Sequence, residues 1–170
     1  DVPEEDLSKI LFAATRGPSG HNTQPFRFLV LRRDEEAAGP RELLGEGFRT
    51  AWAPHREEPA EDDDSRRARM ARTMNHFVDT IEEVPVIVLA CFRSRGQRDD
   101  ISAGASVYPA CQNLLLAARG LGYGGVMTQW HRPVADRLEP ALGLPEDVSI
   151  VNTIPLGRPV GRHGPVRRLP

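Results

Sequence analysis

The sequence has 170 residues, of which 22 are basic, 24 are acidic and 39% are hydrophobic. This length suits one domain with its own core, so we expect residues 1–170 to form a single domain. A net charge of −2 argues against a protein that binds nucleic acid through a basic surface. No apolar segment reaches the roughly 20 residues of a membrane-spanning helix, so we expect no membrane partner.

Helical and extended segments alternate in the first part of the chain. Acidic residues after Pro3, followed by apolar residues at helical spacing, predict a helix that ends at Gly17-Pro18. A polar loop follows, and Phe26–Leu31 then predicts a strand with one apolar face. Arg41–Phe48 is predicted to be helical.

A long polar region from Glu57 to Arg72 leads into an amphipathic segment. Mixed acidic residues and arginines are typical of a solvated loop that passes into an exposed helix, and a loop of this length can also cover a pocket. Both interpretations stay open, and in the second one residues 53–76 form a lid. The amphipathic segment carries an apolar stripe, which we expect in the core: Met70, Met74, Phe77, Val78 and Ile81.

The second half of the chain begins with its most apolar segment. Val86–Phe92 is predicted to be a central strand covered on both faces. A charged loop over residues 93–100 leads to a helix over Ile101–Leu121, in which Pro109 predicts a kink or a broken first turn. The last elements are a short strand, a surface helix and a final strand, over Tyr123–Thr128, Pro133–Leu142 and Ser149–Leu156. The alternation alone indicates a layered sandwich of helices and strands.

Several catalytic motifs are missing. There is no nucleophile elbow, no Walker motif and no dinucleotide-binding glycine motif. The histidines lack metal-ligand spacing, so we expect no metal and interpret them as surface or capping residues: His21, His55, His76, His131 and His163. Cys91 and Cys111 lie in apolar segments, which predicts buried free thiols in a reducing compartment. Since the acidic start also lacks the features of a secretion signal, we expect a cytoplasmic protein.

Three features remain that can bind a ligand. The loop Pro18–Pro25 is dense in hydroxyl, amide and small groups, and it can offer N–H donors to a phosphate or be an ordinary turn. The glycine-rich segment Gly122–Thr128 admits a flat ligand, or is a helix cap followed by a strand. Arginines near the end of the sequence can bind phosphate: Arg158, Arg162, Arg167 and Arg168.

In this order, the three features resemble the flavin-dependent nitroreductase family. Residues 11–31, LFAATRGPSGHNTQPFRFLVL, resemble its Ala-Pro-Ser-x-x-Asn-x-Gln-Pro-Trp segment. Residues 106–128 resemble its helix and glycine-rich strand, and residues 76–92 the helix and central strand before them. Residues 154–170 resemble the closing strand and its phosphate-binding arginines, so the resemblance spans nearly the whole chain.

The resemblance implies an α+β fold with a mostly antiparallel central sheet flanked by helices, in a domain-swapped-style homodimer. It implies that FMN binds between the subunits and passes hydride from NAD(P)H to a nitroaromatic, quinone or similar acceptor in two steps. The implied cofactor contacts are Pro18, Ser19, Gly20, Asn22, Gln24, Gly124, Gly125, Thr128, Arg167 and Arg168. The contacts from the 18–24 loop are expected to reach the partner's flavin. Thr128 is the implied catalytic contact, bonding flavin N5 through its hydroxyl or its N–H.

Two departures keep alternatives open. No Arg-Arg-Ser-x-Arg segment precedes Asp1, so either that segment is missing from the sequence or the flavin is held weakly; Phe26 also replaces the usual Trp. The main alternative is a flavin or deazaflavin carrier with little reductase turnover. A flavin enzyme that dehalogenates or fragments its substrate and a relative without flavin are further alternatives.

Overall fold

An antiparallel sheet lies at the centre of the computed structural model, which describes residues 1–94 and 101–161. Four strands pair in the order β1-β2-β4-β3. Their bounds are Phe26–Arg32 for β1, Val86–Arg93 for β2, Gly124–Gly125 for β3 and Val148–Gly157 for β4. All three pairings are antiparallel, which confirms the α+β class that the resemblance implies.

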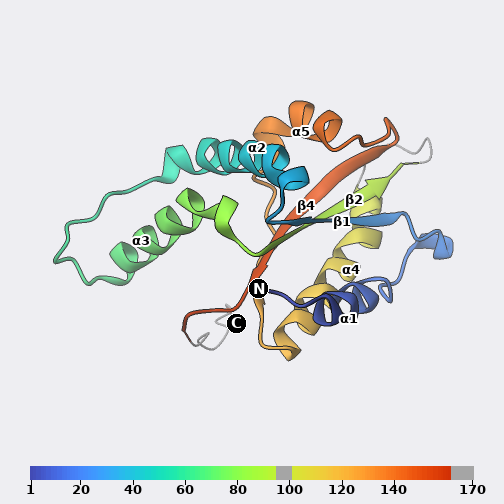
Figure 1. Ribbon diagram of the computed structural model, residues 1–170, viewed down its shortest axis with the longest axis horizontal. Coiled ribbons are helices and arrows are strands. Elements are labelled where there is room, and N and C mark those ends of the chain that lie inside the picture. The colour runs from blue at the N-terminus through green and yellow to red at the C-terminus, as the bar shows by residue number, and fades with distance from the viewer. Residues whose placement is uncertain (95–100, 162–170) are drawn as a thin grey trace.

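Helices cover both faces of the sheet (Figure 1). They are α1 (Glu4–Ala14), α2 (Glu35–Trp52), α3 (Arg66–Asp79), α4 (Ile101–Gly120) and α5 (Ala135–Ala141). Short 3₁₀ turns lie at Gly20–Asn22 (η1), Ala53–His55 (η2), Ile81–Glu83 (η3) and Arg132–Val134 (η4). In the described parts of the chain, no helix combines the length and hydrophobicity that crossing a membrane requires.

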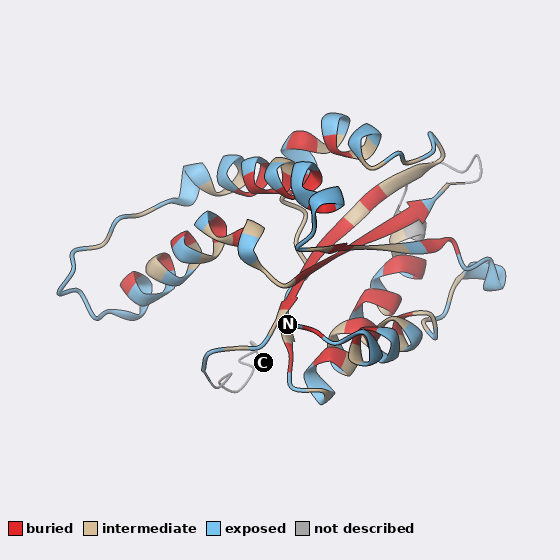
Figure 2. Ribbon diagram, viewed as in Figure 1, coloured by how far each residue is buried: buried red, intermediate tan, exposed pale blue. Residues whose placement is uncertain are grey.

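The two faces of β2 build two separate cores. Val86, Val88, Ala90 and Phe92 pack against α1 and α4, while Ile87, Leu89 and Cys91 face α2 and α5. All seven are buried, as the red central strand in Figure 2 shows, and this confirms the predicted central strand. Fully burying one such apolar side chain stabilises a fold by roughly 1.5–3 kcal/mol, so β2 anchors both layers.

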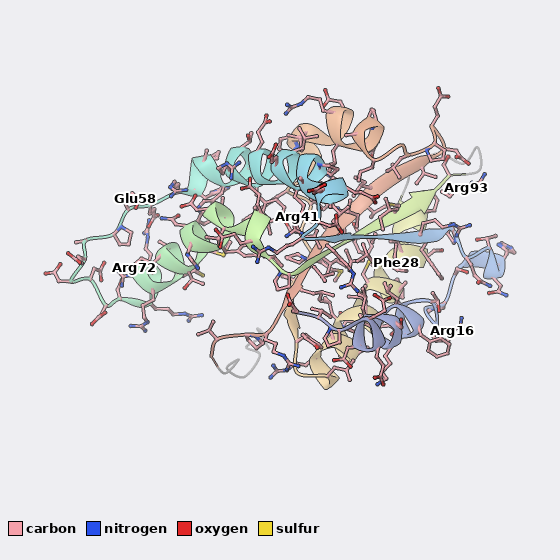
Figure 3. All side chains as sticks on the ribbon, viewed as in Figure 1. Arg16, Phe28, Arg41, Glu58, Arg72 and Arg93 are labelled. Carbon is pink, nitrogen blue, oxygen red and sulfur yellow. The ribbon has the colours of Figure 1, made fainter. Side chains whose placement is uncertain are left out.

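A buried arginine locks α2 to the sheet. Arg41 donates hydrogen bonds to the carbonyls of Leu31 at 2.9 Å, Glu82 at 2.8 Å and Val84, and Figure 3 shows it between α2 and the strands. Burial lowers the pKa of its guanidinium. Because these carbonyls lie on β1, on η3 and just before β2, one side chain fixes the turn through which the chain enters the central strand.

Two helices differ from their predictions. α2 is longer than the predicted Arg41–Phe48, because Asp34 caps it by accepting from the Ala37 N–H at 2.9 Å. α4 runs through Pro109 without a break, since the neighbouring Ala110 and Cys111 are fully buried and their packing outweighs the lost hydrogen bond.

The arm formed by residues 56–65 and α3 extends beyond the C-terminal end of α2, at the left of Figure 1. Asn75 Nδ2 donates to the Glu57 carbonyl at 2.8 Å, and Arg56 pairs with Asp79 at 2.7 Å, so the loop folds back onto α3. Arg72 reaches the same loop by donating to the Asp63 carbonyl at 2.7 Å (Figure 3).

The predicted apolar stripe of this arm divides between three environments. Val78 and Ile81 are in the core, whereas Met74 and Phe77 are partly buried. Met70 is 61% exposed, so its placement in the core was wrong. The other buried residues of α3 are Ala68, Ala71 and Asn75, and Asn75 binds the loop that folds over the helix.

Candidate functional site

A pocket of about 1370 Å³ opens beside the short strand β3. Single-ligand pockets typically measure about 300–1000 Å³, so this volume can take two small ligands together. The strand edge and the segment after it contribute Gly124, Gly125, Thr128, Trp130, Asn152, Leu156 and Gly157. The arm and α4 contribute Thr73, Met74, Phe77 and Tyr108.

The pocket forms where the short strand β3 ends, after only two residues paired with β4. Gly125 pairs with Leu156, and the chain returns to β4 only at the bridge between Thr128 and Thr153. Val126 and Met127, which lie between these pairs, also line the pocket. A two-residue strand therefore leaves part of the β4 edge open.

Thr128 has one free hydrogen-bond donor. Its N–H donates to the Thr153 carbonyl at 3.0 Å, and its hydroxyl oxygen accepts from the Trp130 N–H at 3.3 Å. A hydroxyl that accepts still has its own proton to donate. Of the two groups that the resemblance implied for a ligand bond, the N–H is occupied within the chain and the hydroxyl is available.

His131 holds the segment after Thr128 in place. It is 1% exposed, its Nε2 lies 3.0 Å from the Ile150 carbonyl, and its Nδ1 lies 3.1 Å from the Thr153 hydroxyl. A carbonyl only accepts, so Nε2 carries the proton and Nδ1 accepts from Thr153. Burial lowers the pKa of His131, which keeps the ring neutral. The expectation that the histidines are surface or capping residues was wrong here, because this ring is an internal brace.

Asn152 brings an unsatisfied amide to the pocket. Its side chain is 2% exposed and lies beside the Cys111 thiol, a weak acceptor, while Nδ2 has no hydrogen-bond partner among the described residues. Leaving a buried donor unpaired costs roughly 1–3 kcal/mol. A ligand with a carbonyl or ring nitrogen at this point would recover that energy.

The pocket wall carries positive charge. Arg132 and Arg158 line it, and no carboxylate does among the residues that the structure describes. Arg158 lies 4.7 Å from the centre of the Tyr123 ring, and the Tyr123 hydroxyl donates to Asp6 Oδ2 at 2.6 Å. This chain of contacts holds Arg158 at the rim beyond β4. Within the same residues, no cluster of His, Cys, Asp and Glu is arranged to hold a metal ion.

The predicted glycines and Thr128 meet at this pocket, but not all for the predicted reason. A Cβ on Gly125 would lie 2.6 Å from Leu156 Cδ2 and 3.0 Å from the Pro155 carbonyl oxygen, so β4 packing requires this glycine. Gly122 has φ +85° and caps α4, as predicted. Arg162, Arg167 and Arg168 lie outside the described residues, as does most of the predicted loop over residues 93–100.

The 18–24 loop lies elsewhere, and none of its residues lines the pocket. It precedes Phe26, which pairs with Phe92, and Phe92 in turn pairs with Ser149. The glycines instead pair near Leu156. From Ser149 to Leu156 the strand rises roughly 23 Å, so one chain does not unite the two predicted halves of the site.

The loop is nevertheless built to a defined shape. The Gln24 N–H donates to Ser19 Oγ at 3.0 Å, the Gly20 N–H to Ser106 Oγ at 3.2 Å, and Gln24 Nε2 to Asn22 Oδ1 at 3.0 Å. Asn22 and Gln24 both have positive φ, a left-handed conformation that non-glycine residues adopt rarely. In the same loop Pro18 and Gly20 are exposed and Ser19 is half-exposed.

Comparison with known proteins places this geometry in a family. The family model described as "Nitroreductase family" matches residues 1–158. The chain belongs to the nitroreductase family. A protein of Methanothermobacter thermautotrophicus, provisionally named NADH dehydrogenase/NAD(P)H nitroreductase, is 30% identical over 96% of this chain and 71% of its own length.

Two solved structures are similar to this nitroreductase-family chain. One, from Desulfovibrio desulfuricans, is provisionally named a nitroreductase and was solved in complex with FMN. It is 28% identical to this chain with a TM-score of 0.70, and the match covers 99% of this chain and 81% of that one. The other is an iodotyrosine deiodinase bound to FMN and 3-iodo-L-tyrosine. It is 25% identical with a TM-score of 0.69, and the match covers 99% of this chain and 87% of that one.

The sequence reasoning missed three polar residues of this nitroreductase-family site. His131, Asn152 and Arg132 were not predicted as site residues. The sequence carried one signal for two of them, because Trp130-His131-Arg132 begins one residue after the glycine-rich segment. Asn152 gave a signal only as the amide in an otherwise apolar or hydroxyl-bearing strand.

Proposed function

We propose that two copies of this chain bind FMN at the pocket and catalyse NAD(P)H-dependent reduction of a small acceptor such as a nitroaromatic or a quinone. The observation that carries the proposal is the pocket itself. It combines a free hydroxyl donor on Thr128, an unpaired amide on Asn152 and two arginines without a facing carboxylate. These donors suit a flat ring with polar edges and a phosphorylated tail.

The residues of this chain have separable roles in that proposal. Gly124, Gly125 and Thr128 would hold the ring, with the Thr128 hydroxyl donating to N5. When bound, FMN supplies the two-electron chemistry that accepts hydride from the nicotinamide and delivers it to the acceptor. The phosphate would be bound by Arg167 and Arg168, beyond the end of β4. His131 keeps the Thr128 hydroxyl in position through Thr153.

A second copy would complete the site. The loop with Pro18, Ser19, Gly20, Asn22 and Gln24 is ordered by its own hydrogen bonds yet lies away from its own pocket. A Cβ on Gly20 would meet no atom within 4 Å in this chain, so the surface there is open to close approach. Phe12 on α1 and Leu116 on α4 are 64% and 60% exposed, which supplies an apolar surface for the partner.

The arm would act as the lid over residues 53–76. Thr73 and Met74 belong to this range and line the pocket, and Phe77 follows them. Shortening the loop from Glu57 to Arg66 is expected to change which acceptor is used while FMN stays bound. Loss of FMN from that variant would show that the arm belongs to the cofactor site instead.

Absorbance spectroscopy tests the proposal directly. The purified protein, reconstituted with FMN, is expected to bind it and to bleach when NADH or NADPH is added under anaerobic conditions. Thr128→Val should weaken FMN binding about five- to tenfold, the value of one hydrogen bond, while Thr50→Val on the exposed side of α2 should not. Protein that stays colourless in excess FMN would contradict the proposal.

Sedimentation tests the second copy. The protein is expected to sediment as a dimer at micromolar concentration, and Leu116→Glu should weaken dimerisation and FMN binding together. A monomer that binds FMN with unchanged affinity would contradict a shared site.

Two alternatives remain distinct in the same assays. A flavin carrier would bind FMN and would not bleach with either nicotinamide. Reductive dehalogenation is favoured by the likeness to the deiodinase structure, and it predicts iodide release from a halogenated phenol by the reduced protein.

A further inference from the structure

One end of the pocket joins a guanidinium to an aromatic surface. Arg132, on η4, lines the pocket and is exposed, and its guanidinium makes no ion pair or hydrogen bond with the described residues. Other exposed arginines close by are paired: Arg49 with Glu82 at 2.9 Å and Arg137 with Glu46 at 2.5 Å. Carboxylates are thus available in this region, but none of them meets Arg132.

The aromatic surface beside it is held rigidly. Trp130 lines the pocket, and its ring centre lies 5.4 Å from that of Phe48 and 5.8 Å from that of Trp52. Trp52 Nε1 donates to Asn75 Oδ1 at 2.7 Å, which fixes the ring behind Trp130. Phe77 packs edge-on against Phe48 and also faces the pocket. These contacts hold in place an aromatic wall against which a planar ring can pack.

The two pocket arginines come from different segments of the chain. Arg132 adjoins His131, whose ring contacts Thr153, whereas Arg158 lies five residues further along the chain from Thr153. At about 3.3 Å per residue, the backbone from Thr153 to Arg158 spans at most roughly 16 Å. A cofactor phosphate bound beyond β4 leaves Arg132 free for a different anion.

We propose that the preferred acceptor is a planar aromatic molecule with a carboxylate, whose ring lies against the aromatic wall formed by Trp130 and Phe77 and whose carboxylate binds Arg132. This inference rests on the proposed function, because it names the acceptor class for that same pocket. A guanidinium binds a carboxylate with two parallel hydrogen bonds, and the absence of acidic residues from the described wall means that nothing in it competes. Arg132 is accordingly a specificity-determining residue.

Paired substrates test the charge alone. 4-Nitrobenzoate and 4-nitrobenzamide share the ring and the nitro group and differ in charge. With wild-type holoenzyme, KM for the benzoate is expected to be about five- to tenfold lower than KM for the benzamide. Arg132→Gln should bring the ratio of the two KM values to about one, and Arg33→Gln, an exposed arginine outside the pocket, should leave the ratio as it is.

Three results would overturn the assignment. Equal KM values in the wild type, or an unchanged ratio in Arg132→Gln, would remove charge recognition of the acceptor. A higher Kd for FMN in Arg132→Gln would assign this arginine to the cofactor phosphate. A loss in Arg132→Gln of a wild-type preference for NADPH over NADH would place the recognised anion on the donor.

A binding measurement separates this inference from the proposed function. Nitroaromatic compounds that stack on Trp130 quench its fluorescence, so the protein without flavin can be titrated with both compounds. Tighter binding of the benzoate that disappears in Arg132→Gln would support the anion site even if the protein never reduced an acceptor. Equal quenching by both compounds would overturn it even if the enzyme were active.

Discussion

Replacing His131 with leucine should destabilise the protein and remove part of its pH dependence. The ring makes two buried hydrogen bonds, at 3.0 Å to the Ile150 carbonyl and at 3.1 Å to the Thr153 hydroxyl. Losing the first costs about 1 kcal/mol, and leaving the Thr153 hydroxyl unpaired costs roughly 1–3 kcal/mol. The free energy of unfolding of His131→Leu should therefore fall by about 2–4 kcal/mol.

A double-mutant cycle isolates the bond between the two side chains. Thr153→Val alone leaves His131 Nδ1 without its donor and should cost roughly 1–3 kcal/mol. In the double variant neither polar group remains, so its destabilisation should be smaller than the sum of the single effects by about 1–2 kcal/mol. Urea denaturation followed by circular dichroism measures all four proteins. Strictly additive effects would refute the hydrogen bond as an energetic coupling.

The buried His131 ring also determines how the free energy of unfolding should change with pH. Because burial lowers the pKa of His131, the unfolded chain takes up a proton below about pH 6.5 while the folded protein does not. Wild-type stability should thus decline between about pH 6.5 and the lowered pKa, by about 1.4 kcal/mol for each unit of depression, and level off below it. His131→Leu should lack this component, so equal declines in both proteins from pH 7.5 to pH 5 would contradict the brace.

Two further predictions concern close packing and buried thiols. Gly125→Ala should lower the free energy of unfolding, measured by urea denaturation, by about 1–3 kcal/mol, because its Cβ would lie 2.6 Å from Leu156 Cδ2. The control Gly20→Ala should stay within about 0.5 kcal/mol of the wild type, because its Cβ would meet nothing within 4 Å. Cys91 and Cys111 should resist a thiol reagent at pH 8 until the protein unfolds, because burial raises their pKa values to about 12 and about 11; rapid labelling of the native protein would contradict this.

Helices and strands were predictable where the order of apolar residues along the chain matches the faces that are buried in the fold. Val86–Phe92 is a continuous apolar run because both faces of β2 are covered. In β1 the predicted face of Phe26, Phe28 and Val30 packs in one core, while Leu29 and Leu31 pack in the other. The buried thiols Cys91 and Cys111 were also predicted, and they lie in different cores on opposite faces of the sheet.

The predicted helix Arg41–Phe48 is shorter than α2 at both ends, and two glycines inside it serve contacts that local propensity does not describe. Gly47 lies where a Cβ would be 2.7 Å from the Trp130 carbonyl oxygen, and at Gly45 it would meet the Glu82 carboxylate. These glycines permit close approach of the helix to its neighbours. That reason depends on distant segments of the chain, so local propensity cannot reveal it.

The site was predictable only in part for a related reason. Thr128 and the glycines are contiguous, so a motif captures them, whereas the pocket also requires Phe77 from the arm and Asn152 from β4. Their meeting is set by sheet register and by the early end of β3. In the proposed dimer, the 18–24 loop would reach a pocket only on a second copy, and no pattern within one chain gives that position.

The pocket wall is positively charged although the chain as a whole is negatively charged. The chain as a whole carries a net charge of −2, yet the described pocket wall holds Arg132 and Arg158 and no acid. The apolar and aromatic side chains of the wall screen the field of these two cations less than water would. An anionic ligand would therefore be attracted from the solvent and oriented end to end. Raising the ionic strength should weaken 4-nitrobenzoate binding more than 4-nitrobenzamide binding, and equal salt dependence would show that the two arginines act only as surface side chains.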